Sequence, residues 1–205
     1  MQKLMIVLAA VIAAAIGVAS YQLWPTAEPE ALVYQPPRAP APFQLQSTES
    51  PDAINNQALK GQWTLLFTGY TFCPDICPTT MSDLKNALPN LQQHTDTPVK
   101  VWMISVDPKR DSMERLKEYT GYFGDAFVGI RAEHPQLFPF VRDLGLMYSV
   151  PEEGEENYLV NHSAAIILVN PDGNRIAIFN ADHQAGEIPV VDMEQLKRDF
   201  AIIAG

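Results

Sequence analysis

One stretch decides the fold of this chain: QWTLLFTGYTFCPDICP, residues 62–78. Its first part, Gln62 to Phe67, is a short apolar run rich in β-forming residues, and it predicts a buried strand. After Cys77, Pro78 suits the first position of a helix because that position needs no amide hydrogen. Apolar residues then recur at helical spacing, namely Met81, Leu84, Leu88 and Leu91. The stretch therefore predicts a strand that leads through two cysteines into a helix.

The rest of the chain continues this alternation. We expect strands at residues 99–106, 126–130, 163–169 and 175–179, the last two joined by a turn at 171–174, and helices at about 111–122, 135–144 and 191–203. Asp111 and Glu114 have the spacing of a capping box. Strand–helix units followed by a hairpin and a helix predict an α/β fold, a thioredoxin-like sandwich with a mixed central sheet.

The N-terminal segment has the length and composition of a membrane-spanning helix. Residues 4–23 are uncharged and almost wholly apolar or small, and about 20 helical residues span roughly 30 Å of hydrocarbon. Lys3 favours a cytoplasmic N-terminus with the remainder exported. A cleaved signal peptide is the alternative, since residues 17–19 (Gly-Val-Ala) suit a cleavage site.

We therefore divide the chain into an anchor or signal peptide (residues 1–24), a proline-rich linker expected to be extended (25–43) and a folded domain (44–205). The expected location is a single-pass attachment to the inner membrane, with the domain on the periplasmic side.

Charge and cysteine content restrict the function. The formal net charge of −10 and the lack of basic clusters argue against binding of nucleic acid. The chain contains two cysteines, Cys73 and Cys77. A disulfide between residues so close in sequence closes almost no loop and adds little to stability. The pair is therefore more useful for chemistry than for folding.

The position of Cys73 and Cys77 at a strand–helix junction leaves three interpretations open. In α/β sheets, binding sites gather at the carboxyl ends of strands. Cys77 is expected to cap the helix, whose dipole favours a thiolate. The pair can form an inert disulfide, act as a redox dithiol, or chelate a soft metal ion that requires a third ligand. A redox pair more usually has two intervening residues rather than three.

Four histidines are candidates for the third ligand. His94, His134 and His183 are expected at a helix end, at a helix start and in a polar loop, respectively. His162 precedes the strand at 163–169, and in the thioredoxin-like order that loop lies beside the cysteines. Two thiolates and one imidazole suit Cu(I), and a further oxygen ligand would suit Cu(II). Zinc would retain an open position, but no neighbouring glutamate stands out as a general base.

Three stretches together resemble the Sco/SenC family of copper-binding, thioredoxin-like proteins: GYTFCPDICPTTMSDL (69–84), SVDPKRDS (105–112) and YLVNHSAAIILVNPDG (158–173). The resemblance extends from about Phe43 to the C-terminus. It implies a copper metallochaperone that holds Cu(I) or Cu(II) through Cys73, Cys77 and His162. Its implied partner is the copper-accepting subunit of a membrane terminal oxidase, with other periplasmic copper carriers as further partners.

Within that family, two activities are implied: copper delivery to the binuclear copper centre of cytochrome c oxidase, or reduction of that centre's cysteines. The second makes the chain a thiol-disulfide oxidoreductase whose redox-active pair is Cys73 and Cys77. A peroxidase is a weaker alternative because Tyr70 stands where its nucleophile segment requires threonine.

Two further features of the family stretches bear on the site. Asn161 replaces the aspartate that commonly precedes the ligand histidine, which removes a negative charge and is expected to favour Cu(I) slightly over Cu(II). The family stretch at residues 107–111 is interpreted as a strand end, a turn and a helix cap rather than as a source of metal ligands.

Overall fold

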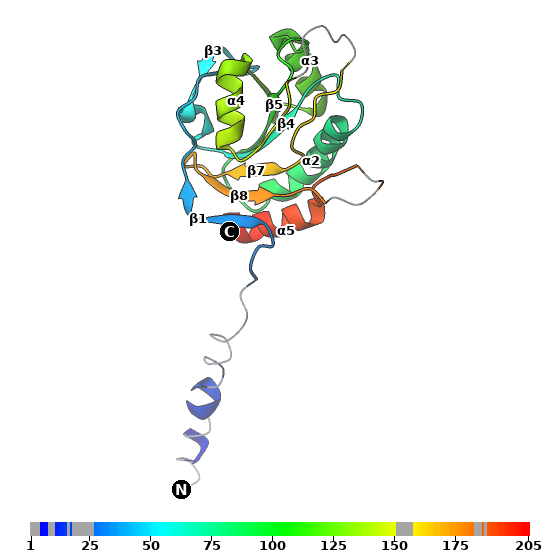
Figure 1. Ribbon diagram of the computed structural model, residues 1–205. Coiled ribbons are helices and arrows are strands. Elements are labelled where there is room, and N and C mark those ends of the chain that lie inside the picture. The colour runs from blue at the N-terminus through cyan, green and yellow to red at the C-terminus, as the bar shows by residue number, and fades with distance from the viewer. Residues whose placement is uncertain are drawn as a thin grey trace.

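The computed structural model describes residues 5–7, 11–15, 17, 27–150, 158–182, 186 and 188–205. Its centre is an eight-stranded mixed sheet with the strand order β1-β8-β7-β4-β5-β6-β2-β3 (Figure 1). The strands are β1 (Leu32–Arg38), β2 (Leu45–Ser47), β3 (Ser50–Ile54), β4 (Trp63–Gly69), β5 (Val99–Ser105), β6 (Phe127–Arg131), β7 (Ile166–Val169) and β8 (Arg175–Phe179). The parallel strands β4, β5 and β6 form the middle, and β7 pairs antiparallel with β4.

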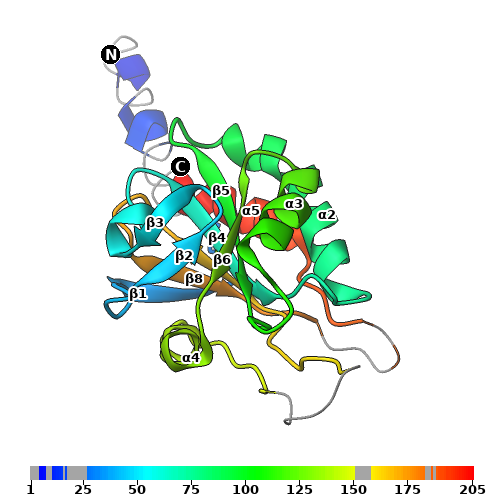
Figure 2. The same cartoon turned by 90° about the horizontal axis from the view of Figure 1, so that it is seen from above.

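Helices cover both faces of this sheet. They are α2 (Ile76–Gln92), α3 (Met113–Phe123), α4 (His134–Asp143) and α5 (Met193–Ala204), and a short 3-10 helix, η1, covers Asn56–Leu59. α2, α3 and α5 pack on one face through Leu84, Leu116 and Leu196, whereas α4 packs on the other through Leu137 and Phe140. Figure 2 shows α4 separated from these three helices by the sheet. This arrangement confirms the predicted α/β sandwich with a mixed sheet.

Two expected helix caps are wrong. α2 begins at Ile76 with Asp75 as its N-cap residue, so Cys77 lies within the first helical turn. α3 is capped by Ser112, whose hydroxyl accepts a hydrogen bond from Arg115 N at 3.1 Å. Asp111 does not cap the helix because its carboxylate is buried and bonded to other side chains.

The expected linker contains a strand. β1 pairs antiparallel with β8 at the edge of the sheet, where a strand tolerates the two prolines Pro36 and Pro37. The buried Asp199 of α5 accepts hydrogen bonds from Glu30 N at 3.1 Å and Ala31 N at 2.8 Å, which fixes the start of β1. The chain is extended here, as its prolines favour, but residues 32–38 belong to the sheet. The β2–β3 hairpin was not predicted either.

Most of the expected membrane-spanning segment lies outside the described residues, which include only 5–7, 11–15 and 17 of the first 24. Among the residues that the structure describes, no helix has the length and apolar character needed to cross a membrane. The membrane anchor therefore stays a prediction from the sequence.

Candidate metal centre

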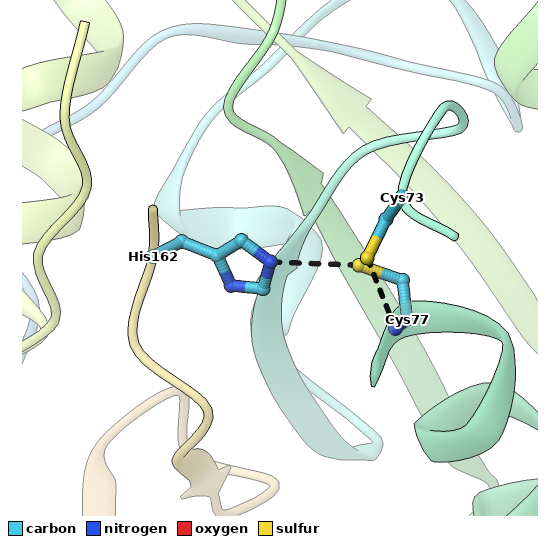
Figure 3. Close-up of side chains that lie close together, drawn as sticks. All are labelled: Cys73, Cys77 and His162. Atoms are coloured by element: carbon cyan, nitrogen blue, oxygen red, sulfur yellow. Dashed lines mark hydrogen bonds between the residues drawn. The ribbon is translucent and has the colours of Figure 1, made fainter. Parts of the chain in front are cut away.

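Cys73, Cys77 and His162 come together at the carboxyl end of β4. Cys73 lies in the loop after β4, Cys77 in the first turn of α2, and His162 in the segment before β7. Their ligand atoms all lie within 4.8 Å of one another. In Figure 3 both sulfur atoms point toward the imidazole from the opposite side of the site. The structure thus assembles the three predicted ligands from segments 85 residues apart.

The sheet brings His162 to the cysteines. Because β7 runs antiparallel to β4, with Leu66 opposite Ile167, the residues before β7 lie at the end of β4 where the cysteine loop begins. A β-bridge between Tyr148 and His162 holds the segment from its other side. Two backbone hydrogen bonds of 2.8 Å form this bridge. Ser149 N donates to Asn161 O, and Ser163 N donates to Met147 O.

Hydrogen bonds orient the imidazole of His162. Its Nδ1 lies 3.0 Å from Ser163 O and 3.4 Å from Thr68 Oγ1. Because Thr68 Oγ1 donates its own hydrogen to Ser163 O at 2.8 Å, both oxygens act as acceptors toward Nδ1. This network assigns the proton to Nδ1 and leaves the Nε2 lone pair free. Nε2 faces Cys77 Sγ at 3.5 Å, which is the orientation that a metal ligand requires.

The two cysteines are not joined by a disulfide, and their environments differ. Cys77 is 1% exposed, whereas Cys73 is half-buried. A hydrogen bond from the Cys77 thiol lowers the pKa of Cys73 to about 4 against the opposing effect of burial, with a further contribution from the backbone amide of Cys77, which lies 3.4 Å from Cys73 Sγ. The same hydrogen bond, together with burial, raises the pKa of Cys77. Cys73 is therefore the thiolate and Cys77 the thiol of a pair that shares one proton.

Gly69, the last residue of β4, leaves room for the sulfur of Cys77. A Cβ atom at this position would lie 3.2 Å from Cys77 Sγ, and 3.3 Å from both Met103 Cγ and Phe67 Cε2. A residue with a side chain would therefore crowd the floor of the site.

The buried carboxylate of Asp111 holds the loop that carries Cys73 through hydrogen bonds, and it is not one of the candidate metal ligands. Asp111 accepts hydrogen bonds from Thr71 Oγ1 and Ser105 Oγ, both at 2.6 Å, and from Thr71 N at 3.1 Å. Burial raises the pKa of the Asp111 carboxyl group, although these hydrogen bonds oppose the shift. Within the described ranges, no carboxylate belongs to the group of potential metal ligands.

Two of the remaining histidines, His94 and His134, lie outside the group of potential metal ligands. His94 is exposed just beyond the end of α2. His134 begins α4, and its Nδ1 lies 2.9 Å from Tyr148 Oη. His183 falls outside the residues that the structure describes.

The donor set fits a soft metal ion. Two sulfur atoms and one imidazole nitrogen suit Cu(I), which accepts few ligands and favours thiolates. Because Cys73 is already a thiolate, binding requires the loss of one proton from the pair. Three ligands leave coordination positions open to an oxygen ligand or to a thiolate of another protein.

These features define a class: a thioredoxin-like domain with a candidate Cys/Cys/His metal centre at the end of a central strand. The SCO1/SenC family model matches residues 33–195. This chain belongs to the SCO1/SenC family.

Individual relatives agree with this assignment. A protein of Stutzerimonas stutzeri whose name proposes that it binds copper is 37% identical over 139 residues, which are 67% of this chain and 68% of that protein. The chain spans 40%, 55% and 49% of three mitochondrial relatives, from Arabidopsis thaliana, mouse and human.

Two solved structures with copper bound resemble the fold. Arabidopsis thaliana ScoI is 28% identical, with a TM-score of 0.68 over 79% of this chain and 95% of that one. Bradyrhizobium japonicum ScoI is 31% identical, with a TM-score of 0.60 over 69% of this chain and 89% of that one.

Proposed function

We propose that this chain is a copper metallochaperone that binds one copper ion through Cys73, Cys77 and His162. One observation carries the proposal: the three ligand atoms lie within 4.8 Å of one another, with His162 Nε2 facing the sulfur atoms. The relatives solved with copper bound support copper as the ion. Delivery to the binuclear copper centre of cytochrome c oxidase follows from the family resemblance.

The open coordination of the site suits transfer. A thiolate of an accepting protein can enter beside the bound ion and share it before the first protein releases it. Cys73 is the more exposed of the two sulfur ligands, so we propose that it faces the accepting protein. The accepting protein is proposed to be a membrane oxidase subunit with its own cysteine and histidine ligands.

The proposed location is the outer side of the cytoplasmic membrane, with residues 1–24 as an anchor. It rests on the uncharged apolar segment at residues 4–23 and on Lys3 before it. The mass of the mature protein, recovered from whichever of the membrane and soluble fractions contains it, separates an uncleaved anchor from a cleaved signal peptide.

Copper stoichiometry of the reduced full-length protein tests the proposal. We expect one copper ion per chain, lost in Cys73→Ser and in Cys77→Ser and bound far more weakly in His162→Ala. His94→Ala is the matched control, since His94 is exposed away from the site. Tight copper binding by His162→Ala would contradict the three-ligand centre.

A thiol-disulfide oxidoreductase is the second candidate, favoured by the lowered pKa of Cys73. The Cys73 thiolate would attack a disulfide of the oxidase subunit, form a mixed disulfide and release one thiolate of that subunit. Cys77, after losing its proton, would then attack Cys73 Sγ and release the second thiolate. The partner gains two electrons, and a Cys73–Cys77 disulfide forms. Full disulfide reductase activity in His162→Ala, together with tight copper binding, would favour this function over copper transfer.

A further inference from the structure

Arg110 contacts both loops that carry the candidate metal ligands, although it belongs to neither. Its Nη2 donates a hydrogen bond to Tyr158 O at 3.1 Å, four residues before His162. Its guanidinium carbon lies 3.7 Å from the ring centre of Tyr158 and 4.9 Å from that of Phe72, the residue before Cys73. One side chain from the loop after β5 thus connects two loops. The first is the cysteine loop between β4 and α2 (residues 70–75), and the second is the histidine loop before β7 (residues 158–165).

Arg110 is itself held in place by a buried partner. Its Nε forms an ion pair with Asp107, whose side chain is 2% exposed. Tyr158 Oη donates to the same carboxylate at 2.8 Å. Tyr158 therefore contacts Arg110 through its backbone carbonyl and its ring, and contacts Asp107 through its hydroxyl. A planar guanidinium can make these contacts at once, whereas an ammonium group cannot.

The histidine loop depends on side chains on the N-terminal side of His162. After His162, the chain enters β7 and its ladder of backbone hydrogen bonds. Before His162, Val160 N donates to Tyr70 Oη at 3.3 Å, and Tyr158 O accepts from Arg110. Residues 158–160 are outside the named strands, so these two contacts act together with the Tyr148–His162 bridge to hold the segment beside the cysteines.

We infer that Arg110 is a positioning residue of the metal centre, which sets the separation between His162 and the two sulfur atoms. This inference rests on the proposed copper site. Arg110 contacts no ligand atom and acts through the Tyr158 segment on one side and Phe72 on the other. Loss of an outer partner of this kind typically weakens metal binding about 10–100-fold.

Arg110→Lys tests the inference, because lysine keeps a positive charge beside Asp107 but cannot also bond Tyr158 O and stack on its ring. Arg142→Lys is the matched control, since Arg142 is exposed on α4. Cu(I) affinity of the full chain is measured by competition with a chromophoric chelator, and the Cu(II) site by its thiolate-to-copper absorption. We expect Arg110→Lys to weaken Cu(I) binding about 10-fold and to shift the absorption, and the control to do neither.

A His162→Ala background separates positioning from a general effect on folding. If Arg110 acts through His162, Arg110→Lys causes no further loss of affinity once His162 is absent. An equal loss in both backgrounds, or wild-type affinity and absorption in Arg110→Lys, would overturn the inference. Absence of copper binding in the wild-type chain would instead refute the proposed function.

Tyr158→Phe provides the same test if Arg110→Lys fails to fold, as judged by urea unfolding. It removes only the hydroxyl that bonds Asp107. We expect a smaller loss of Cu(I) affinity than in Arg110→Lys, again dependent on His162. Unchanged affinity in a folded Tyr158→Phe protein would refute the inference.

Discussion

Replacement of Gly69 by alanine is expected to destabilise the protein and weaken metal binding together. The added Cβ would lie 3.2–3.3 Å from atoms of Cys77, Met103 and Phe67, closer than the roughly 3.5–4.0 Å at which carbon atoms pack best. All three neighbours are at most 3% exposed, so none can move into solvent. Crowding of this kind in a packed interior costs about 1–3 kcal/mol.

The sulfur of Cys77 is the neighbour with room to move, because it faces the metal site. Its displacement alters the ligand geometry, and we expect Cu(I) affinity to fall about 10-fold. Urea unfolding of the reduced, metal-free protein measures the stability change, and chelator competition measures the affinity.

Gly121→Ala is the matched control for Gly69→Ala. Gly121 is exposed within α3, and nothing lies within 4 Å of a Cβ at this position. Alanine favours a helix over glycine by about 0.5–1 kcal/mol, so this variant is expected to be more stable and to bind copper normally. Wild-type stability and affinity in Gly69→Ala would refute the argument that Gly69 makes room for the sulfur.

Two further predictions concern the charge at the site. At about pH 6, iodoacetamide is expected to label Cys73 of the reduced apoprotein far faster than Cys77, because the pKa of Cys73 is lowered to about 4 while that of Cys77 is raised. In Cys77→Ala the labelling of Cys73 should move to higher pH, since the Cys77 hydrogen bond is the largest cause of the lowered pKa of Cys73. Peptide mass spectrometry measures the labelling of each cysteine. Equal labelling of Cys73 and Cys77 in the unchanged protein would contradict the assignment of Cys73 as the thiolate. Asn161→Asp adds an exposed negative charge beside His162, which is expected to favour Cu(II). An exposed charge contributes about 0.2–1 kcal/mol, so the copper reduction potential should fall by about 10–40 mV. An unchanged potential and Cu(II) affinity would show that Asn161 has no such influence.

The core of the sandwich was predictable because each element is encoded locally. The apolar runs that form β4, β5, β7 and β8 lie close to their expected positions, since a buried strand needs a short apolar segment and little else. The N-terminal strands were not predictable in this way. β1 contains two prolines and is mostly exposed, so it lacks the apolar pattern of a strand and forms only because β8 offers an unpaired edge.

Helix caps were the least predictable local feature. The spacing of Asp111 and Glu114 satisfied the capping rule, but burial of Asp111 against Thr71 and Ser105 outweighed it. Those partners lie on β5 and on the loop after β4, so the competition exists only in the folded protein. The pKa difference between the two cysteines depends first on the hydrogen bond between their sulfur atoms and then on burial, and the strand–helix junction in the sequence reveals neither.

The sequence by itself determined the strand–helix junction, the two cysteines and the soft-metal chemistry, because these depend on residue type and local spacing. It also selected His162, but only by its order along the chain. The tertiary structure decided that His162 Nε2 faces the sulfur atoms, that Cys73 is the thiolate, and that Arg110 joins the two loops. The placement of His162 and the contacts of Arg110 depend on segments tens of residues apart, and the antiparallel pairing of β7 with β4 brings the His162 segment to the cysteines. The thiolate state of Cys73 depends chiefly on the hydrogen bond from Cys77, four residues along the chain.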